Sequence, residues 1–457
     1  MKHRHIIFCF TLSALLFSGC FKQSPVQNEP PVSSSSANPP AATSAKSAAS
    51  QETSEEKAVR ERTQQLGGTI RKNQAAQIIG IVIENSEQLT IADMQAIAKL
   101  SDLESIRLVG PTVTDEYVKA IGSLSKLKSV DIENSNITDE SLEILKALPE
   151  IETLALRRNL AFTDKAIQLF AEFPNLKTLK ILYNGFSSTA LMGLGKLESV
   201  RVLDLRALPV GDDTLLFIAK LKHLEEIRIK SESVTNFGVA QLKKCKALKI
   251  IELQDVSVES GCAEEFKEME QLRYLRLFRC KQFGAEAIAE LGALTNLETL
   301  ELRDLNSSNE SLQALKTLVH LKTVEFSELT DVDAATIVDV LKSYLALENV
   351  RMFAMPADDS VAEFLASVPS LKSVALPATA ITDKGLDALT ALKNLQTLDI
   401  HGNKELITLQ GAQVLSKFKN LRRLILPETL DDKNLKSTIL KSSPRCVTTV
   451  KTYSQEG

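Results

Sequence analysis

The chain has 457 residues, of which 44% are hydrophobic and 5% are aromatic, and its formal net charge is −4. A chain of this length and composition can bury a sizeable core. Binding to nucleic acid needs a concentrated basic footprint, so the small net charge and the lack of a Lys/Arg-rich run argue against a nucleic-acid partner.

The first twenty residues predict export. Lys2 and Arg4 precede an apolar run over residues 6–17, which is shorter than the ~20 residues that a membrane-spanning helix needs. The small residues Ser18 and Gly19 then stand directly before Cys20, and this arrangement resembles the lipobox of bacterial lipoprotein precursors. The resemblance implies a lipoprotein signal peptide over residues 1–19 and a lipid on Cys20. An ordinary cleaved secretory signal is the alternative.

Lipidation would place the mature protein on a membrane without a spanning helix, because acyl chains give stable anchoring. We therefore expect an exported protein that is lipid-anchored to a bacterial membrane, either in the periplasm or at the cell surface. Loss of residues 1–19 removes two positive charges and no acid, so the net charge changes from −4 to −6.

Residues 20–55 predict a disordered linker. This segment includes the stretch PPVSSSSANPPAATSAKSAAS and has no apolar periodicity. Such a composition cannot offset its ordering entropy by burial. A flexible linker of ~35 residues has an r.m.s. reach of roughly 30 Å, which would hold the folded part away from the bilayer.

The rest of the chain is repetitive. The pattern L-x-x-L-x-L recurs about fifteen times at spacings of 24–26 residues. The first apolar position of each expected strand is Ile81, Ile106, Val130, Leu154, Leu179, Leu203, Ile227, Ile251, Leu275, Leu300, Val324, Val350, Val374, Leu398 and Leu424. Apolar residues at period two predict a short strand with one buried face.

A helix is expected after each strand. In residues 138–148, Leu142, Leu145 and Leu148 form one apolar stripe at helical spacing. Thr-Asp pairs at 114–115, 138–139, 163–164 and 382–383 stand where such helices begin. Thr suits the N-cap and Asp suits the positive end of the helix dipole, so these pairs predict capping rather than calcium binding.

These units resemble leucine-rich repeats. The step I-T-D-x-x-L, seen in AITDKGLDAL and NITDESLEIL, is similar to the cysteine-containing subfamily and to repeat proteins of planctomycete-type bacteria. The lead-in QQLGGTIRKNQAAQIIGIVIE is similar to the start of those bacterial proteins, where a short helix and a Gly-Gly turn precede the first strand.

The resemblance implies an α/β horseshoe-shaped solenoid over residues 56–430. Its parallel strands would line the concave side and its helices the convex side. Residues 431–457 would form a C-terminal cap and tail, without a further strand.

One loop position in this class of repeat holds Asn or Cys, whose side chain binds backbone groups of the stacked loops. In this sequence the position holds Asn159, Asn184, Cys280 and Asn403, with polar substitutes at Ser86, Ser135, Thr379 and Thr429. Other repeats carry apolar or acidic residues there, so we expect a broken ladder. Cys280 and the other thiols of the folded part, Cys245, Cys262 and Cys446, fall on different edges of a solenoid, which predicts free buried thiols rather than disulfides.

No sequence motif indicates catalysis. Nucleotide-binding, metal-binding and serine-nucleophile motifs are absent, and the repeats fill every stretch long enough for a catalytic domain. We therefore expect no enzymatic activity, no cofactor and no metal.

Three residues of each strand face the concave side. Their middle column alternates in charge, and the simplest interpretation is a self-neutralising ladder that keeps the sheet soluble. The third column has four cations and no acid between Arg157 and Arg303. Arg and aromatic residues often dominate binding energy. We hypothesise that exposed residues on this face bind a partner, namely Tyr274, Arg276, Phe278, Arg303, Arg351 and Phe353, with further cations at Arg206, Arg228 and Lys230.

The function predicted from the sequence is a monomeric, non-catalytic protein-interaction module at the cell envelope. One alternative is a structural scaffold or spacer of the envelope. A ubiquitin-ligase-type substrate adaptor follows only from analogy of fold, and the secretory signal contradicts it.

Overall fold

The computed structural model describes residues 52–403 and 406–451. The predicted signal peptide, Cys20 and the linker up to residue 51 lie outside the described residues. The last part of the predicted linker was wrong, because α1 (Ser54–Gln65) already begins there. Thr53 and Glu56 form a capping box in which each side chain accepts a hydrogen bond from the other residue's backbone N–H.

Seventeen strands form one sheet in the described residues, and each strand pairs with the next along the chain. Only β1 and β2 are antiparallel. The strands are β1 (Thr69–Lys72), β2 (Ile78–Ile83), β3 (Ser105–Val109), β4 (Ser129–Glu133), β5 (Thr153–Arg157), β6 (Thr178–Lys180), β7 (Val202–Asp204), β8 (Glu226–Lys230), β9 (Ile250–Gln254), β10 (Tyr274–Phe278), β11 (Thr299–Arg303), β12 (Thr323–Ser327), β13 (Asn349–Arg351), β14 (Ser373–Ala375), β15 (Thr397–Asp399), β16 (Arg423–Pro427) and β17 (Val447–Lys451).

The predicted register is confirmed in all fifteen repeats. From Ile81 of β2 to Leu424 of β16, the first apolar residue of each strand stands opposite that of the next strand. All fifteen are buried in one continuous hydrophobic core. A strand shifted by one residue would turn its apolar side chains to the opposite face, so burial fixes this register.

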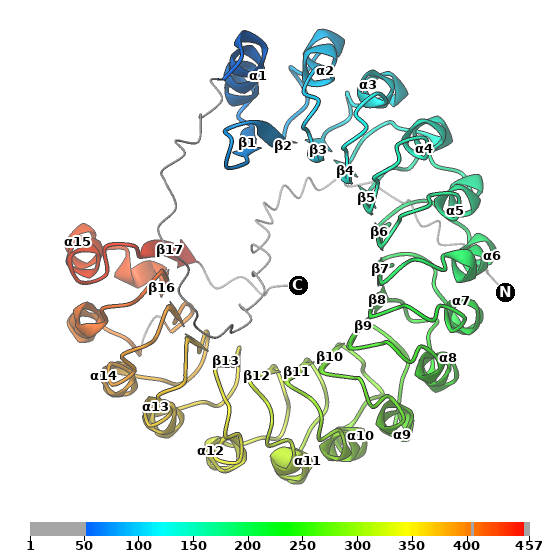
Figure 1. The fold of residues 1–457 in the computed structure, drawn as a ribbon. Helices are drawn as coiled ribbons and strands as arrows, with labels where there is room; N and C mark the ends of the chain where they lie inside the picture. The colour runs from blue at the N-terminus through cyan, green and yellow to red at the C-terminus, as the bar shows by residue number, and fades with distance from the viewer. Residues whose placement is uncertain (1–51, 404–405, 452–457) are drawn as a thin grey trace, which may run out of the picture. The chain divides into compact units, whose positions relative to one another are not determined.

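The strands form the inner layer and the helices the outer layer of the repeats (Figure 1). After α1 come α2 (Ile91–Ile97), α3 (Asp115–Ile121), α4 (Asp139–Leu145), α5 (Lys165–Phe170), α6 (Ser188–Leu191), α7 (Asp212–Ile218), α8 (Asn236–Gln241), α9 (Cys262–Lys267), α10 (Ala285–Glu290), α11 (Asn309–Ala314), α12 (Ala334–Leu341), α13 (Asp359–Ala366), α14 (Asp383–Leu389) and α15 (Lys433–Ser442). Short 3₁₀ turns are η1 (Met192–Lys196), η2 (Leu242–Lys244), η3 (Leu291–Ala293), η4 (Leu315–Thr317), η5 (Gly411–Lys417) and η6 (Glu428–Leu430).

The C-terminal segment differs from the prediction. Residues 431–457 contain a further helix, α15, and a further parallel strand, β17, so Leu424 does not belong to the last strand. The position that is apolar in every other repeat holds Thr448, which pairs with Leu424. This polar residue hides the strand from any search for the L-x-x-L-x-L pattern.

The Thr-Asp pairs stand at the starts of helices, as predicted, but they do not all cap in the same way. Thr138 and Thr382 are N-caps whose side chains accept backbone N–H groups, as predicted. Thr114 is an N-cap without a side-chain hydrogen bond, and Asp164 rather than Thr163 stands at the N-cap of α5.

The Asp of each pair reaches the following repeat. Asp115 accepts hydrogen bonds from the backbone N–H of Thr138 at 2.9 Å and from its hydroxyl at 2.8 Å. Asp383 contacts Thr408 in the same way, at 2.8 and 2.7 Å. These carboxylates therefore tie neighbouring repeats together along the N-terminal ends of the helices.

The loop ladder is present where the sequence predicted it. Asn159, Asn184, Cys280, Asn403, Ser86, Ser135 and Thr379 are all buried. Thr429 is the exception: it is exposed, because the chain after β16 turns into η6 instead of continuing the loop.

A row of left-handed residues turns the chain at the end of most strands. The fourth residue after the first apolar position has φ of 50–58° at ten non-glycine positions, including Tyr183, Arg279, Ala354 and Ala378. A residue with a Cβ atom is strained in this region, by roughly 1–2 kcal/mol. Glycine meets the same need at Gly402, with φ of 80°.

We expect the double substitution Ala354→Gly/Ala378→Gly to stabilise the solenoid. Each change relieves strain at a φ of 50–53°, so the free energy of unfolding should rise by roughly 0.5–1 kcal/mol per site. The control is Ala388→Gly inside α14, where the same substitution should cost about 1 kcal/mol. Urea denaturation measures both, and a loss of stability in the double variant would contradict the strain argument.

Candidate partner-binding face

The concave residues of β10 are less exposed than the sequence predicted. Phe278 is 6% exposed and Phe353 of the loop after β13 is 1% exposed, so the expectation of aromatic side chains on a solvated face was wrong for both. Arg303 is also buried, and Tyr274 is half-buried. Neighbouring strands lie ~4.8 Å apart, and long arginine side chains from adjacent repeats reach far enough to cover the rings.

Three guanidinium groups converge on the ring of Phe278. Those of Arg279, Arg303 and Arg276 lie 4.4, 4.8 and 5.8 Å from the ring centre. The guanidinium of Arg303 also lies 5.4 Å from the ring centre of Phe353. A cation over an aromatic face within ~6 Å is attracted by the ring quadrupole. We call Arg276, Phe278, Arg279 and Arg303 the arginine cluster.

Sequence reasoning missed Arg279. This residue follows β10 at the left-handed position, with φ of 52°, which brings its side chain back over the ring of Phe278. The alternation of residues within a strand gives no signal for such a side chain. The left-handed position recurs at a fixed place in most repeats, and that recurrence could have identified Arg279.

Each arginine of the cluster has an acidic partner. Arg279 pairs with Asp255 at 2.8 Å, Arg303 with Glu328 at 2.8 Å, and Arg276 with Glu301 at 3.5 Å. The side chains of Arg276 and Arg279 still keep 31% and 27% of their exposure. Each of these two residues therefore has part of its side chain accessible to a partner.

The carboxyl of Glu301 is the most perturbed acid of this face. Burial and the neighbouring Glu325 raise its pKa and Arg276 lowers it, and the net result is a pKa of about 7. Burial also raises the pKa of the Tyr274 hydroxyl, which forms a hydrogen bond with Glu301. The carboxyl of Glu301 is therefore mainly protonated at mildly acidic pH.

The other predicted cations are also paired. Arg206 contacts Asp204 at 2.7 Å, Arg228 contacts Glu226 at 2.6 Å, and Lys230 contacts Asp255 at 3.5 Å. Arg351 lies 3.7 Å from both Glu325 and Asp399. Within the middle column, Arg228 also lies 3.4 Å from Glu252 and Arg351 pairs with Glu325, as a self-neutralising column predicts. The apparent excess of cations in the third column is balanced by acids outside that column.

The structure brings the predicted residues together in two groups. Arg276 and Arg303 both contact Phe278, and Phe353 joins them through Arg303, while Tyr274 and Arg276 meet at Glu301. Arg206, Arg228 and Lys230 lie on the earlier strands β7 and β8 or directly after them, among their own acidic partners.

The four cysteines of the described chain are free and buried, as predicted. Burial raises the pKa of Cys245 to about 11 and the pKa values of Cys262 and Cys280 to about 12. Thiols of this kind are inert, since the thiolate is the reactive form.

Among the described residues, no group of three His, Cys, Asp or Glu side chains is placed to hold a metal ion. Within the same residues, the helices are too short or too polar to cross a bilayer.

Comparisons with known proteins add context. No family model matches the chain, and no curated protein matches it. Among solved structures, an internalin of Listeria monocytogenes aligns with 16% identity and a TM-score of 0.41, over 87% of this chain and 94% of that one. A leucine-rich repeat protein of Leptospira interrogans aligns with 17% identity and a TM-score of 0.39, over 80% and 99%.

The fold itself rests on the register and the layers described above. One mostly parallel sheet, with a helix or 3₁₀ turn after nearly every strand and a repeat of 24–26 residues, is the arrangement of this class. The chain has the leucine-rich repeat fold, a solenoid of strand and helix units.

Proposed function

We propose that this protein is a non-catalytic binding module of the bacterial cell envelope, exported and anchored by a lipid on Cys20, which holds a protein partner on its concave face. The arginine cluster is the observation that supports this function best. Its guanidinium groups are fixed by ring contacts and ion pairs before any partner arrives, which lowers the entropy lost on binding. Planar guanidinium donors recognise carboxylates and backbone carbonyls, and Arg is enriched among residues that dominate binding energy.

Substitution of the aromatic residues would not test this function cleanly. Phe278 is buried, so its removal would change stability as well as the surface. The better variant is Arg276→Gln/Arg279→Gln, which keeps the ring and removes two partly exposed cations.

Crosslinked affinity capture from native envelopes measures the effect. We expect the double variant to lose at least tenfold in recovery of the specific partner, because residues that dominate an interface contribute more than about 1 kcal/mol each. The control is Arg201→Gln/Lys249→Gln, which removes the same charge from the pair of cations around Glu225. Equal recovery with all three proteins, or no saturable partner for the wild type, would overturn the proposal.

The anchor has a separate test. Incorporation of a labelled fatty acid into the full-length chain should disappear in Cys20→Ser. Persistence of the label in that variant would contradict lipidation at this residue.

A structural spacer is the second candidate function, because ion pairs neutralise most of the concave cations. For a spacer, Arg276→Gln/Arg279→Gln should leave envelope integrity unchanged, while Cys20→Ser should impair it. The two variants therefore separate the two functions.

A further inference from the structure

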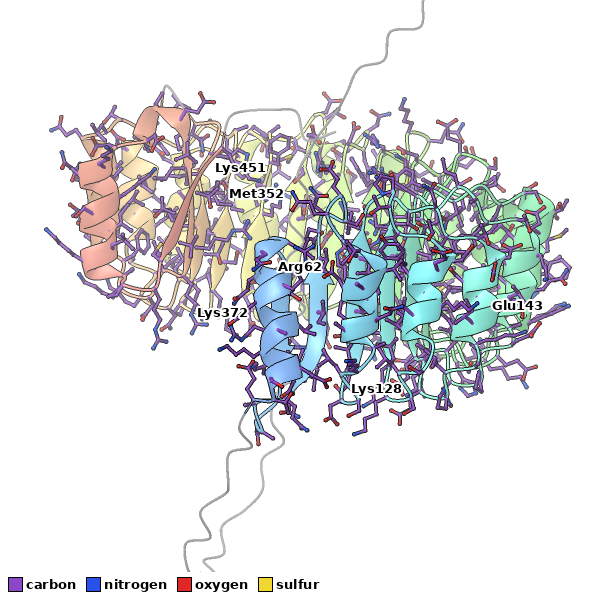
Figure 2. All side chains as sticks on the ribbon, turned by 90° about the horizontal axis from the view of Figure 1, so that it is seen from above. Arg62, Lys128, Glu143, Met352, Lys372 and Lys451 are labelled. Carbon is purple, nitrogen blue, oxygen red and sulfur yellow. The ribbon has the colours of Figure 1, made fainter. Side chains whose placement is uncertain are left out.

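One edge of the solenoid carries a ladder of charges. The residue two positions before the first apolar residue of each strand lies on this edge, and Figure 2 labels two examples, Lys128 and Lys372. Along most of the edge each cation has an acidic neighbour in an adjacent repeat. Examples are Lys128 with Glu104 at 3.2 Å, Lys177 with Glu152 at 2.5 Å, Lys322 with Glu298 at 2.6 Å and Lys372 with Glu348 at 2.7 Å.

The ladder ends after Lys372. The next two positions hold Gln396 and Arg422, so no acid follows. Six exposed cations of this C-terminal region have no carboxylate within ion-pair distance among the residues that the structure describes. They are Lys393, Lys419, Arg422, Arg423, Lys441 and Arg445, which we call the basic corner.

Backbone contacts bring the basic corner together from three successive repeats. The Asn420 side chain donates a hydrogen bond to the carbonyl of Lys393 at 2.7 Å. The N–H of Val447 donates to the carbonyl of Arg422 at 2.8 Å, and Arg423 stands opposite Val447 in the register of β16 and β17. Arg445 lies two residues before Val447, at the start of β17, and Lys441 lies near the end of α15.

Apolar side chains lie among these cations. Val447 is 66% exposed and Leu440 is 46% exposed, and neither has a core role. Arg422 of the basic corner also lines a polar groove of about 480 Å³, together with Asn394, Asn420 and the ion pair of Lys372 with Glu348. Amide and guanidinium groups of this kind can donate hydrogen bonds to phosphate oxygens.

We propose that the basic corner is a docking surface for a bilayer rich in anionic phospholipid. Clustered Lys and Arg side chains are attracted to the negative surface potential of such a bilayer. Exposed apolar residues beside them can enter the boundary between headgroups and acyl chains. A nucleic acid would use the cations but would give Val447 and Leu440 no apolar environment, so the combination favours a membrane. The proposal requires neither a lipid on Cys20 nor a partner on the concave face.

The test is sedimentation of full-length Cys20→Ser protein with vesicles of phosphatidylcholine alone or with added phosphatidylglycerol. We expect binding only to the anionic vesicles, and weaker binding at high salt. Each cation near an anionic surface multiplies affinity by about five, so Arg422→Gln/Arg423→Gln should weaken binding about thirtyfold. Val447→Thr keeps a residue suited to a strand and should weaken binding several-fold, because an apolar contact is lost.

The matched control is Lys128→Gln/Lys177→Gln. It removes the same charge from the same edge, in the paired part of the ladder, and should bind within twofold of the parent protein. If both double variants lost the same vesicle affinity, net charge alone would explain the binding, and the proposal would be overturned. Lack of binding to anionic vesicles would also overturn it, as would tighter binding to duplex DNA than to the vesicles. Circular dichroism establishes that each variant is folded.

Discussion

Replacement of Asn159 by Ala is expected to lower the free energy of unfolding by about 3–5 kcal/mol. The side chain is 0% exposed and binds polar groups of the preceding repeat. Its Oδ1 accepts hydrogen bonds from the Ser135 N–H at 3.1 Å and the Ser135 hydroxyl at 2.7 Å, and its Nδ2 donates to the carbonyl of Ile132 at 3.0 Å. The substitution would leave these groups buried without partners, and each such group costs about 1–3 kcal/mol.

Asn175 provides the matched control. Its Nδ2 also donates to a backbone carbonyl one repeat away, that of Pro149 at 2.8 Å, but this contact is exposed to water. Asn175→Ala should therefore cost less than about 1 kcal/mol, because water can replace the lost partner. Urea denaturation of the two variants measures the difference, and similar losses in both would show that burial of the ladder does not determine its contribution.

The sequence predicts the scaffold well because one physical constraint repeats. Each strand must bury alternate residues against the same core. A single apolar pattern therefore identifies the first apolar residue of every strand from Ile81 to Leu424. The pattern fails at β17, where Thr448 replaces the apolar residue and the neighbouring Leu424 alone reveals the pairing. The loop ladder was predictable for the same reason, since Asn159 and Asn403 recur at a fixed distance from their strands.

The candidate site was less predictable because it depends on side chains of different repeats. Alternation within β10 correctly turns Phe278 toward the concave side, yet it says nothing about Arg279 and Arg303, which cover the ring. The ion pairs were hard to predict for the same reason, because their partners belong to different repeats. Lys230 has no acid in its own column, but Asp255 of the following repeat lies 3.5 Å away.

The lipid on Cys20 and the basic corner would contribute to membrane attachment in different ways. The proposed lipid on Cys20 would limit the distance between solenoid and membrane, whereas the proposed docking surface would fix an orientation. In Cys20→Ser the vesicle affinity of the basic corner should remain while membrane retention in cells is lost. The arginine cluster belongs to β10 and β11 and the basic corner to the last repeats of the chain, so both surfaces can act in one molecule.

The second large effect is expected at Glu301, whose carboxyl should make the solenoid less stable as the pH rises from 5 to 8. Its side chain is 17% exposed and faces Glu325 on β12, Glu252 on β9, and Arg276 and Tyr274 on β10. Burial and Glu325 raise its pKa from the ordinary 4.5 to about 7. A pKa that is higher in the folded state means that folding favours the protonated form. The stabilising contribution is therefore complete below about pH 4.5 and is lost as the pH rises through about 7.

The variant Glu301→Gln removes this dependence on pH. A shift of one pKa unit corresponds to ~1.4 kcal/mol, so the wild type should lose about 3 kcal/mol between pH 4.5 and pH 8 through this group, and the variant should not. Gln also offers Tyr274 a side-chain acceptor, so the hydrogen bond can persist. Urea denaturation at pH 5 and pH 8 should give curves that diverge, with the variant the more stable at pH 8. The control Glu298→Gln, on an edge where the side chain is 44% exposed beside Lys322, should change stability by less than about 1 kcal/mol at both pH values. Parallel loss of stability in the wild type and Glu301→Gln would show that this carboxyl is ionised throughout, and that Arg276 outweighs both Glu325 and burial.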